Sequence, residues 1–156
     1  MSAQITRDGD TVVFTRAWSA RAPLARVIEA TRLERTPELH PLITRVAQLV
    51  ESGARSECVV HETVPLGPLR LPNSYRAARE VVAANEQAAR LVLEASAALG
   101  TTLRHELALR AEGARTEVTH VVRVRAPRLV LGFVARTAER AHDAWVERVA
   151  AWAERA

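Results

Sequence analysis

The chain of 156 residues is 48% hydrophobic and only 4% aromatic, a composition that suits one domain with its own core. Its 22 basic residues are all arginines, but 18 acidic residues are interspersed and the net charge is only +4, so no basic block indicates a nucleic-acid surface. The single cysteine, Cys58, excludes an intramolecular disulfide, and no segment is apolar enough for a signal peptide or a membrane span. We therefore expect residues 1–156 to form one cytoplasmic domain with no nucleic-acid partner and no integral membrane segment.

The first predicted element is a strand over residues 11–20, because TVVFTRAWSA is rich in β-branched and aromatic residues and follows the turn signal DGD. Two short helices are predicted next, over residues 23–31 and 36–41. Pro23 and Pro37 stand at their first-turn positions, where a missing N–H costs nothing.

From residue 43 onward the pattern changes to strands joined by short turns. Six strands, separated by segments containing glycine, proline or asparagine, are expected over residues 43–51, 57–64, 69–82, 87–99, 102–111 and 114–126. Residues 87–98 are rich in alanine, but their alternation at period 2 favours a strand over a helix. Successive hairpins of this kind form an antiparallel meander.

The last predicted element is a long amphipathic helix over residues 128–156. Its apolar residues recur at spacings of three and four, namely Val130, Val134, Ala138, Ala141, Trp145, Val149 and Trp152. A helix of this length is stable in water only when its apolar stripe lies on another element, and the meander supplies that surface.

Alternation along the strands predicts a sheet with one wet face and one dry face. The dry face carries polar residues, namely Glu62, Asn73, Tyr75, His105 and His120. A two-residue turn at positions 112–113 places His105 directly opposite His120, and matching the dry faces at the other turns aligns one row of Val60, Asn73, Ala97, His105 and His120. Because Ala95 and Ala97 stand where a filled core has larger residues, and because buried polar groups need partners, we expect a cavity here.

Two interpretations of the imidazoles stay open. His105 and His120 can bond each other or core water, or one of them can act as a general acid or base, with Tyr75 as a further catalytic candidate. His40 is either a loop residue or part of a lid. The residues expected to line the cavity and bind its ligand are Trp18, His40, Val60, Glu62, Asn73, Tyr75, Ala95, Ala97, His105, His120, Val134, Ala138, Ala141 and Trp145.

The sequence predicts no metal site and no cofactor. A metal ion held by His105 and His120 needs a third ligand, and Cys58 lies a row away and three strands across in the predicted sheet. No phosphate-binding, dinucleotide-binding or common hydrolase motif is present. Arg79, near a strand end, and Arg16, beside Trp18, are expected to extend their guanidinium groups to water.

The order of elements and several short segments resemble the START/Bet v 1-like (SRPBCC) superfamily, especially bacterial proteins described as polyketide cyclase/dehydrase. These segments are APLARV at 22–27, ELHP at 38–41, RTEV at 115–118, APRLVL at 126–131 and AERAH at 138–142. The resemblance implies an α+β helix-grip fold, in which a curved seven-stranded antiparallel sheet with two short helices holds a long C-terminal helix over a cavity. It assigns no catalytic residue, because no catalytic signature is general to the superfamily.

Three functions follow as hypotheses. The first is binding of a hydrophobic small molecule, such as a polyketide, lipid or isoprenoid. The second is a cofactor-free polyketide cyclase or dehydratase, of lyase or isomerase type, that uses a cavity histidine as general acid or base and Tyr75 or Asn73 to hold a substrate carbonyl. The third is a protein-binding role without a ligand. A homodimer stays open.

Overall fold

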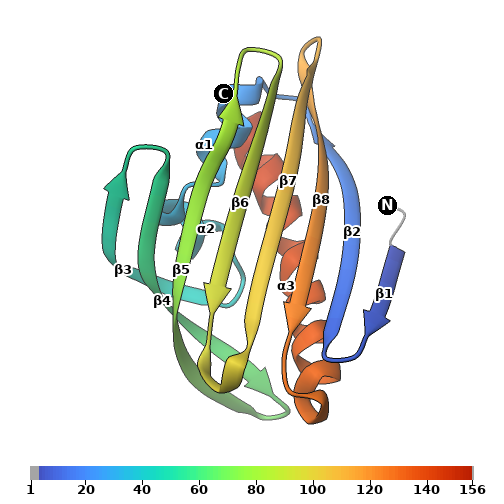
Figure 1. The fold of residues 1–156 in the computed structure, drawn as a ribbon. Helices are drawn as coiled ribbons and strands as arrows, with labels where there is room; N and C mark the ends of the chain where they lie inside the picture. The colour runs from blue at the N-terminus through green and yellow to red at the C-terminus, as the bar shows by residue number, and fades with distance from the viewer. Residues whose placement is uncertain (1–3, 156) are drawn as a thin grey trace.

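The computed structural model describes residues 4–155 of the chain. They form a curved antiparallel sheet of eight strands in the order β1-β2-β8-β7-β6-β5-β4-β3, and a long helix lies across its concave face (Figure 1). The predicted α+β class and helix-grip arrangement are confirmed. The strands are β1 (Gln4–Asp8), β2 (Thr11–Ala20), β3 (Ile43–Ser52), β4 (Arg55–Leu66), β5 (Leu69–Ala84), β6 (Ala88–Ser96), β7 (Thr102–Glu112) and β8 (Arg115–Arg125).

The sheet has eight strands where the sequence predicts seven. The additional strand is β1, which pairs antiparallel with β2 at the edge of the sheet. All five of its residues are exposed, so its sequence carries no alternation of buried and exposed side chains that would have revealed it. Its backbone hydrogen bonds to β2 alone define it as a strand.

The helices are close to their predicted positions. They are α1 (Leu24–Ala30), α2 (Thr36–Leu39) and α3 (Arg128–Glu154), with short 3₁₀ turns at Leu33–Arg35 and Ala98–Gly100. Pro37 lies in the first turn of α2, as its missing N–H favours. The predicted end of the last helix at Ala156 lies outside the described residues. Among residues 4–155, no helix combines the length and the apolar character that crossing a bilayer requires.

The predicted hairpin registers are wrong. His105 lies opposite Val122 rather than His120 across β7 and β8, because the hairpin turns at positions 113–114. Between β6 and β7, His105 lies opposite Leu93 rather than Ala97, because residues 97–101 form a wider loop in which Leu99 has a positive φ of 58°. Between β4 and β5, the pairs are Val60 with Tyr75 and Glu62 with Asn73.

The predicted dry face is nevertheless kept, because His105 is displaced by two positions on one side and by four on the other. Side chains alternate between the faces of a strand, so an even displacement moves a residue along its face without moving it to the other face. The sequence therefore assigned residues to the correct face but to the wrong cross-strand neighbours.

The hairpin of β4 and β5 projects beyond the rest of the sheet. Pairing between β5 and β6 ends at Arg76 and Ser96, so residues 69–75 of β5 pair with β4 alone. This explains how Pro72, which has no N–H to donate, fits within a long strand.

The helix α3 buries a wider face in its second half than in its first half. Its second half buries Ala141, Trp145, Val149 and Trp152, four members of the predicted stripe. In its first half Leu131 and Ala135 are the buried residues, and they pack with Phe14, Val122 and Val124 of β2 and β8. The predicted residue Val130 is 40% exposed instead. The other side of the first half, with Val134, Thr137 and Ala138, faces strands β4 to β7 across a space.

Arg16 is buried beneath α3, contrary to its predicted position at the surface. Its side chain in β2 points inward and is only 3% exposed. Its Nη2 atom lies 2.5 Å from Glu139 and its Nε atom lies 3.0 Å from Asp143, two carboxylates on successive turns of α3. These carboxylates allow a guanidinium group to be buried, since an unpaired buried charge would be strongly unfavourable.

Arg79 is also buried rather than extended to water. Its Nε and Nη2 atoms donate hydrogen bonds to Oγ1 of Thr31, and Nη2 also donates to the carbonyl of Ile28. Thr31 is the residue at which α1 ends. The guanidinium group therefore adds a hydrogen bond to a carbonyl at the helix C-terminus that Thr31 also contacts, and a positive charge is favoured there by the helix dipole.

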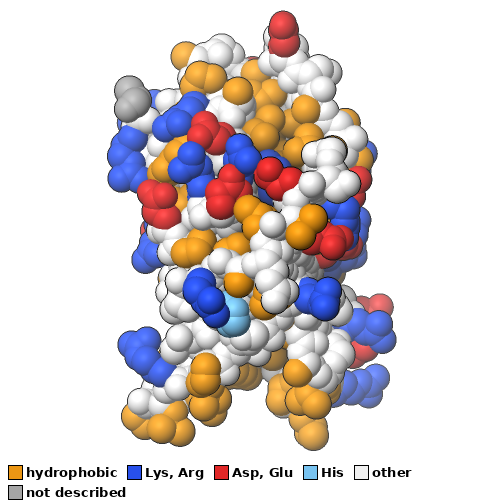
Figure 2. Space-filling view, turned by 90° about the vertical axis from the view of Figure 1, so that its left-hand side faces the viewer, with side chains coloured by type: hydrophobic (Ala, Val, Ile, Leu, Met, Phe, Trp, Pro, Cys, Tyr) orange, Lys and Arg blue, Asp and Glu red, His pale blue; other side chains and the backbone are white. Residues whose placement is uncertain are grey.

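Exposed apolar side chains gather at one end of the molecule. Figure 2 shows two apolar groups at its lower end, below a band of charged side chains, and this end carries the β4–β5 hairpin, the β6–β7 connection and the start of α3 in Figure 1. The large exposed hydrophobic residues of these segments are Leu66, Leu69, Leu71, Leu99, Leu129, Val130 and Phe133. We call this set the apolar rim.

The ion pairs of Arg16 predict a stability effect. We expect Arg16→Gln to lower the free energy of unfolding by about 2 kcal/mol, because Glu139 and Asp143 lose their partner while still partly buried. Urea denaturation followed by circular dichroism measures this change. The matched control is Arg125→Gln, which removes an exposed ion pair with Asp10 and should leave the midpoint unchanged. Equal midpoints for the two variants would contradict the role assigned to Arg16.

Candidate functional site

A cavity of about 320 Å³ lies between the concave face of the sheet, the first half of α3 and the segment from Thr31 to Ile43. Most of its wall is apolar. Ala77 and Ala95, which are direct cross-strand neighbours on β5 and β6, contribute only methyl groups to that wall. The helix contributes small residues at Ala138 and Ala141. The space exists because small side chains stand on both of its walls.

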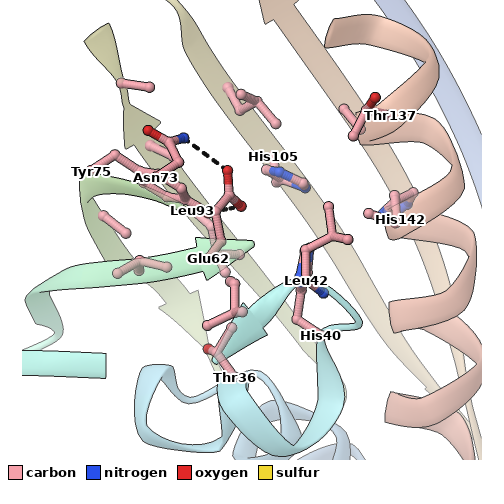
Figure 3. Close-up of a pocket in the computed structure, with 18 of the residues that line it drawn as sticks. Thr36, His40, Leu42, Glu62, Asn73, Tyr75, Leu93, His105, Thr137 and His142 are labelled. Carbon is pink, nitrogen blue, oxygen red and sulfur yellow. Dashed lines mark hydrogen bonds between the residues drawn. The ribbon is translucent and has the colours of Figure 1, made fainter. Parts of the chain in front are cut away.

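Three polar side chains form one group on the wall supplied by β4 and β5. Oε1 of Glu62 accepts a hydrogen bond of 2.9 Å from Nδ2 of Asn73, and its Oε2 accepts one of 3.1 Å from the hydroxyl of Tyr75 (Figure 3). We call these residues the Glu62 cluster. The cross-strand pairing of Glu62 with Asn73 brings them together.

Burial raises the pKa of Tyr75 far above its ordinary value, and the negative charge of Glu62 and their hydrogen bond raise it further. The phenol is therefore neutral at physiological pH. It acts as a hydrogen-bond donor and cannot serve as a phenolate base. The Glu62 cluster offers a ligand one acidic side chain whose oxygens are held in place by an amide and a phenol.

Three imidazoles from three elements form a second polar group, which we call the histidine cluster: His105 of β7, His120 of β8 and His142 of α3. Nδ1 of His105 lies 3.1 Å from Nε2 of His120, a hydrogen-bond distance. The ring of His142 stands edge-on to that of His120, with centroids 4.0 Å apart and planes at 87°. His105 and His142 line the cavity, and Figure 3 shows His142 of α3 across from the Glu62 cluster with His105 of β7 between them.

Several ring nitrogens of the histidine cluster have no hydrogen-bond partner. Nδ1 of His120 and both ring nitrogens of His142 are buried and unpaired. An unsatisfied buried polar atom costs about 1–3 kcal/mol, so native proteins rarely leave several in one place.

The imidazoles of the cavity are neutral at physiological pH. Burial lowers the pKa of His105 to about 4 and is the main cause that lowers the pKa of His142 to about 2. Burial, together with His142 and His105, also lowers the pKa of His120 well below its ordinary value. At the cavity wall His40 has its pKa lowered to about 4, by burial first and then by His105 and Arg148. Each neutral ring therefore has one donor and one acceptor nitrogen. His105 and His120 share one hydrogen bond, and Nδ1 of His40 accepts one from the backbone N–H of Leu42.

Twelve of the residues predicted to bind a ligand lie in the cavity wall: His40, Val60, Glu62, Asn73, Tyr75, Ala95, Ala97, His105, Val134, Ala138, Ala141 and Trp145. Trp18 and His120 do not. Trp18 packs in the filled core with Val27, Leu91 and Trp145, and His120 is fully buried behind His105. Of the catalytic candidates, His105 and Tyr75 therefore face the cavity, whereas His120 contacts the wall residues His105 and His142 from behind.

The sequence argument missed several wall residues, namely Thr36, Leu42, Leu93, Leu103, Phe133, Thr137 and His142. His142 is the most important omission. It stands four residues after Ala138 and three before Trp145, so helical spacing already placed it on the predicted stripe. Leu93 and Leu103 were assigned to the dry face but not to the cavity, because the predicted registers were wrong.

Comparison with known proteins identifies structures of the same fold but no protein of similar sequence. No family model and no curated protein sequence matches the chain. Solved structures do match. The ZhuI aromatase/cyclase from Streptomyces sp. R1128 has a TM-score of 0.70 at 16% identity, over 93% of this chain and 94% of that one. This is the START/Bet v 1-like fold.

Other structures share the START/Bet v 1-like fold with this chain. A STAR-related lipid transfer protein from Xanthomonas axonopodis has a TM-score of 0.66 at 12% identity, over 94% and 98% of the two chains. A norcoclaurine synthase from Thalictrum flavum has a TM-score of 0.60 at 13% identity, over 96% and 94%. At these identities the likeness is one of fold, and the activities of these proteins differ from one another.

The neutral cavity imidazoles predict that acid destabilises the fold. Because burial lowers the pKa of His40, His105 and His142 in the folded chain, the unfolded chain binds protons first as the pH falls below about 6.5. Their contribution to the free energy of unfolding is complete above that pH and declines toward about pH 4.

Denaturant unfolding at a series of pH values, in the presence of a chelator, measures this decline. His105→Gln should flatten the pH dependence, whereas His61→Gln, at a half-buried histidine outside the cavity that bonds Ser74, should not change it. A pH dependence that is the same in wild type and His105→Gln would contradict the assignment.

Proposed function

We propose that the chain binds a hydrophobic small molecule, of polyketide, lipid or isoprenoid type, in the cavity between the sheet and α3. The observation that carries the proposal is an apolar cavity of about 320 Å³ whose wall holds two separate polar groups, the Glu62 cluster and the pair of His105 and His142. Binding sites for small molecules are commonly apolar pockets of about 300–1,000 Å³ with a few polar groups that orient the ligand.

The two polar groups restrict the chemistry of the ligand. Glu62 presents carboxylate oxygens, which favour a hydroxyl or another hydrogen-bond donor on the ligand. His105 and His142 present neutral rings, which hydrogen-bond to a carbonyl or hydroxyl without a requirement for charge. We therefore infer an elongated, uncharged ligand with oxygen atoms near both ends and hydrocarbon between them.

The apolar rim supports entry of such a ligand from one end. Phe133 is 37% exposed and also lines the cavity, as do Val64, Ala98 and Leu103 from the segments that carry the rim. An apolar molecule can thus pass from solvent or a carrier into the cavity without leaving apolar surface. We place the entrance between the start of α3 and the β6–β7 connection.

Proteins of the same fold support the proposal. One neighbour is an aromatase/cyclase and another is a lipid transfer protein, and both names concern hydrophobic molecules. The cytoplasmic location and the single domain expected from the sequence remain predictions, as does a homodimer.

A second candidate function is that of a cofactor-free polyketide cyclase or dehydratase. The observation that favours it is His105, whose imidazole faces the cavity while its Nδ1 atom contacts His120. A pKa of about 4 makes His105 a weaker base than free imidazole. It suits removal of an acidic proton, such as one between two carbonyl groups, with the neutral phenol of Tyr75 or the amide of Asn73 holding a carbonyl oxygen.

Filling the cavity tests the binding function. Ala95→Leu should weaken binding of an apolar fluorescent probe at least tenfold, because the new side chain occupies space in the wall. It should also leave stability unchanged or raise it by about 1 kcal/mol, since it buries methyl groups in existing space. The matched control is Ala108→Leu, on the exposed face of β7, which should bind the probe like wild type. Unchanged probe binding by Ala95→Leu would contradict the proposal.

Kinetics with a synthetic poly-β-ketone separate the two candidate functions. If the chain is a cyclase, His105→Gln should reduce turnover at least a hundredfold while ligand affinity changes little, because a general base contributes about 10²–10⁴-fold. Tyr75→Phe should reduce turnover less. If His105→Gln retains full turnover, the acid-base role is wrong, and if wild type shows binding without turnover, the carrier function stands alone.

A further inference from the structure

The histidine cluster brings together one ring nitrogen from each of His105, His120 and His142, all within 4.8 Å of one another. The sequence argument against a metal site was the lack of a third ligand beside His105 and His120. In the structure the third ligand is His142 of α3. The sequence argument considered only pairing between strands and so could not include a helix residue.

Within residues 4–155, no hydrogen bond satisfies several buried ring nitrogens of this cluster. His120 is fully buried and His142 is 3% exposed, yet Nδ1 of His120 and both nitrogens of His142 have no partner. A ligand in the cavity can reach His142 but not Nδ1 of His120, which lies behind the cavity wall. An ion bound among the three rings would engage a nitrogen of His142 that has no other partner within residues 4–155.

We propose that the histidine cluster binds one divalent transition-metal ion, of which Zn²⁺ is the reference, through one ring nitrogen from each histidine. Zn²⁺ bonds to imidazole at about 2.0–2.1 Å, which places two ligand nitrogens of a tetrahedral site about 3.3 Å apart. The nitrogens of His105 and His120 are already 3.1 Å apart. The largest separation in the cluster must shorten by about 1.5 Å, which side-chain rotation of His142 can provide.

The surroundings of the cluster suit such an ion. Phe14 packs against His142 at 5.6 Å, and Trp145 packs against both His120 and His142, so aromatic rings exclude water on these sides. Metal binding requires neutral imidazoles, and burial keeps these rings neutral at physiological pH. Three nitrogen ligands favour Zn²⁺, Co²⁺ or Ni²⁺ over Mg²⁺ or Ca²⁺, which prefer oxygen.

The charged groups around the cluster define its electrostatics. Arg16 is the arginine whose charge acts on His142, and this charge is offset by Glu139 and Asp143. These carboxylates are held by Arg16 and do not complete the site. The fourth position therefore faces the cavity past His105 and His142, where a water molecule or an oxygen atom of the bound ligand can occupy it.

The test uses protein without an affinity tag, stripped of metal with a chelator and dialysed. Calorimetric titration with Zn²⁺ should show one ion bound per chain, and Co²⁺ should give the strong visible absorption of a four-coordinate ion. His105→Gln and His142→Gln, both at the cavity wall, should each weaken Zn²⁺ binding at least a hundredfold. The matched control, His61→Gln, removes a half-buried histidine outside the cavity and should bind Zn²⁺ like wild type.

The outcomes decide the proposal. Wild type that binds no stoichiometric Zn²⁺, or folded His105→Gln and His142→Gln variants that bind it like wild type, would overturn it. Loss of binding in His61→Gln would do the same, because the ion would then lie on the surface. Circular dichroism checks that each variant is folded. Because the apolar probe is measured on metal-free protein, failure of the metal site leaves the ligand-binding function unaffected.

Discussion

The position of α3 depends on one buried guanidinium group. Arg16 reaches from β2 to Glu139 and Asp143, which lie on successive turns in the middle of the helix. This contact sets the helix against β2 and β8, where Leu131 and Ala135 complete a packed core. The far side of the same half of the helix then has no strand beneath it. The cavity is the space between this side of the helix and strands β4 to β7. The ion pairs of Arg16 on one side of the helix thus leave room for an apolar cavity on its other side.

The comparison of sequence and structure shows which information a strand pattern contains. Alternation at period 2 fixes the face of each residue, and the faces of His105, Tyr75 and Ala95 were predicted correctly. It does not fix the neighbour across the strand, because any displacement by an even number of residues satisfies the same pattern. Loop conformation decides among those registers, and the positive φ of Leu99 is not evident from its residue type. The strand β1 was missed for a related reason, since a fully exposed strand has no pattern at all.

The candidate site was predictable in part. Polar residues on a dry face and alanines in mid-strand indicated a cavity, and most of the expected residues lie in its wall. His142 could not be joined to His105 and His120 from the sequence, because a helix packed across a sheet has no register that spacing can predict. Helical periodicity gave its face but not its partner. The two polar groups of the cavity differ in the same respect: the Glu62 cluster forms within one hairpin, whereas the histidine cluster requires the tertiary fold.

The bond network of Arg79 has a consequence for the mechanics of the cavity. Its guanidinium group attaches Thr31 and Ile28 to strand β5, and Ile43 begins strand β3 at the other end of the same cavity-lining segment. The segment from Thr31 to Ile43 is thus attached to the sheet at both of its ends. Between these ends, the buried side chain of Leu33 packs against the sheet and that of Leu39 packs against α1. The wall formed by α2 is therefore attached to the sheet at both of its ends, whereas Leu129 in the first turn of α3 is fully exposed.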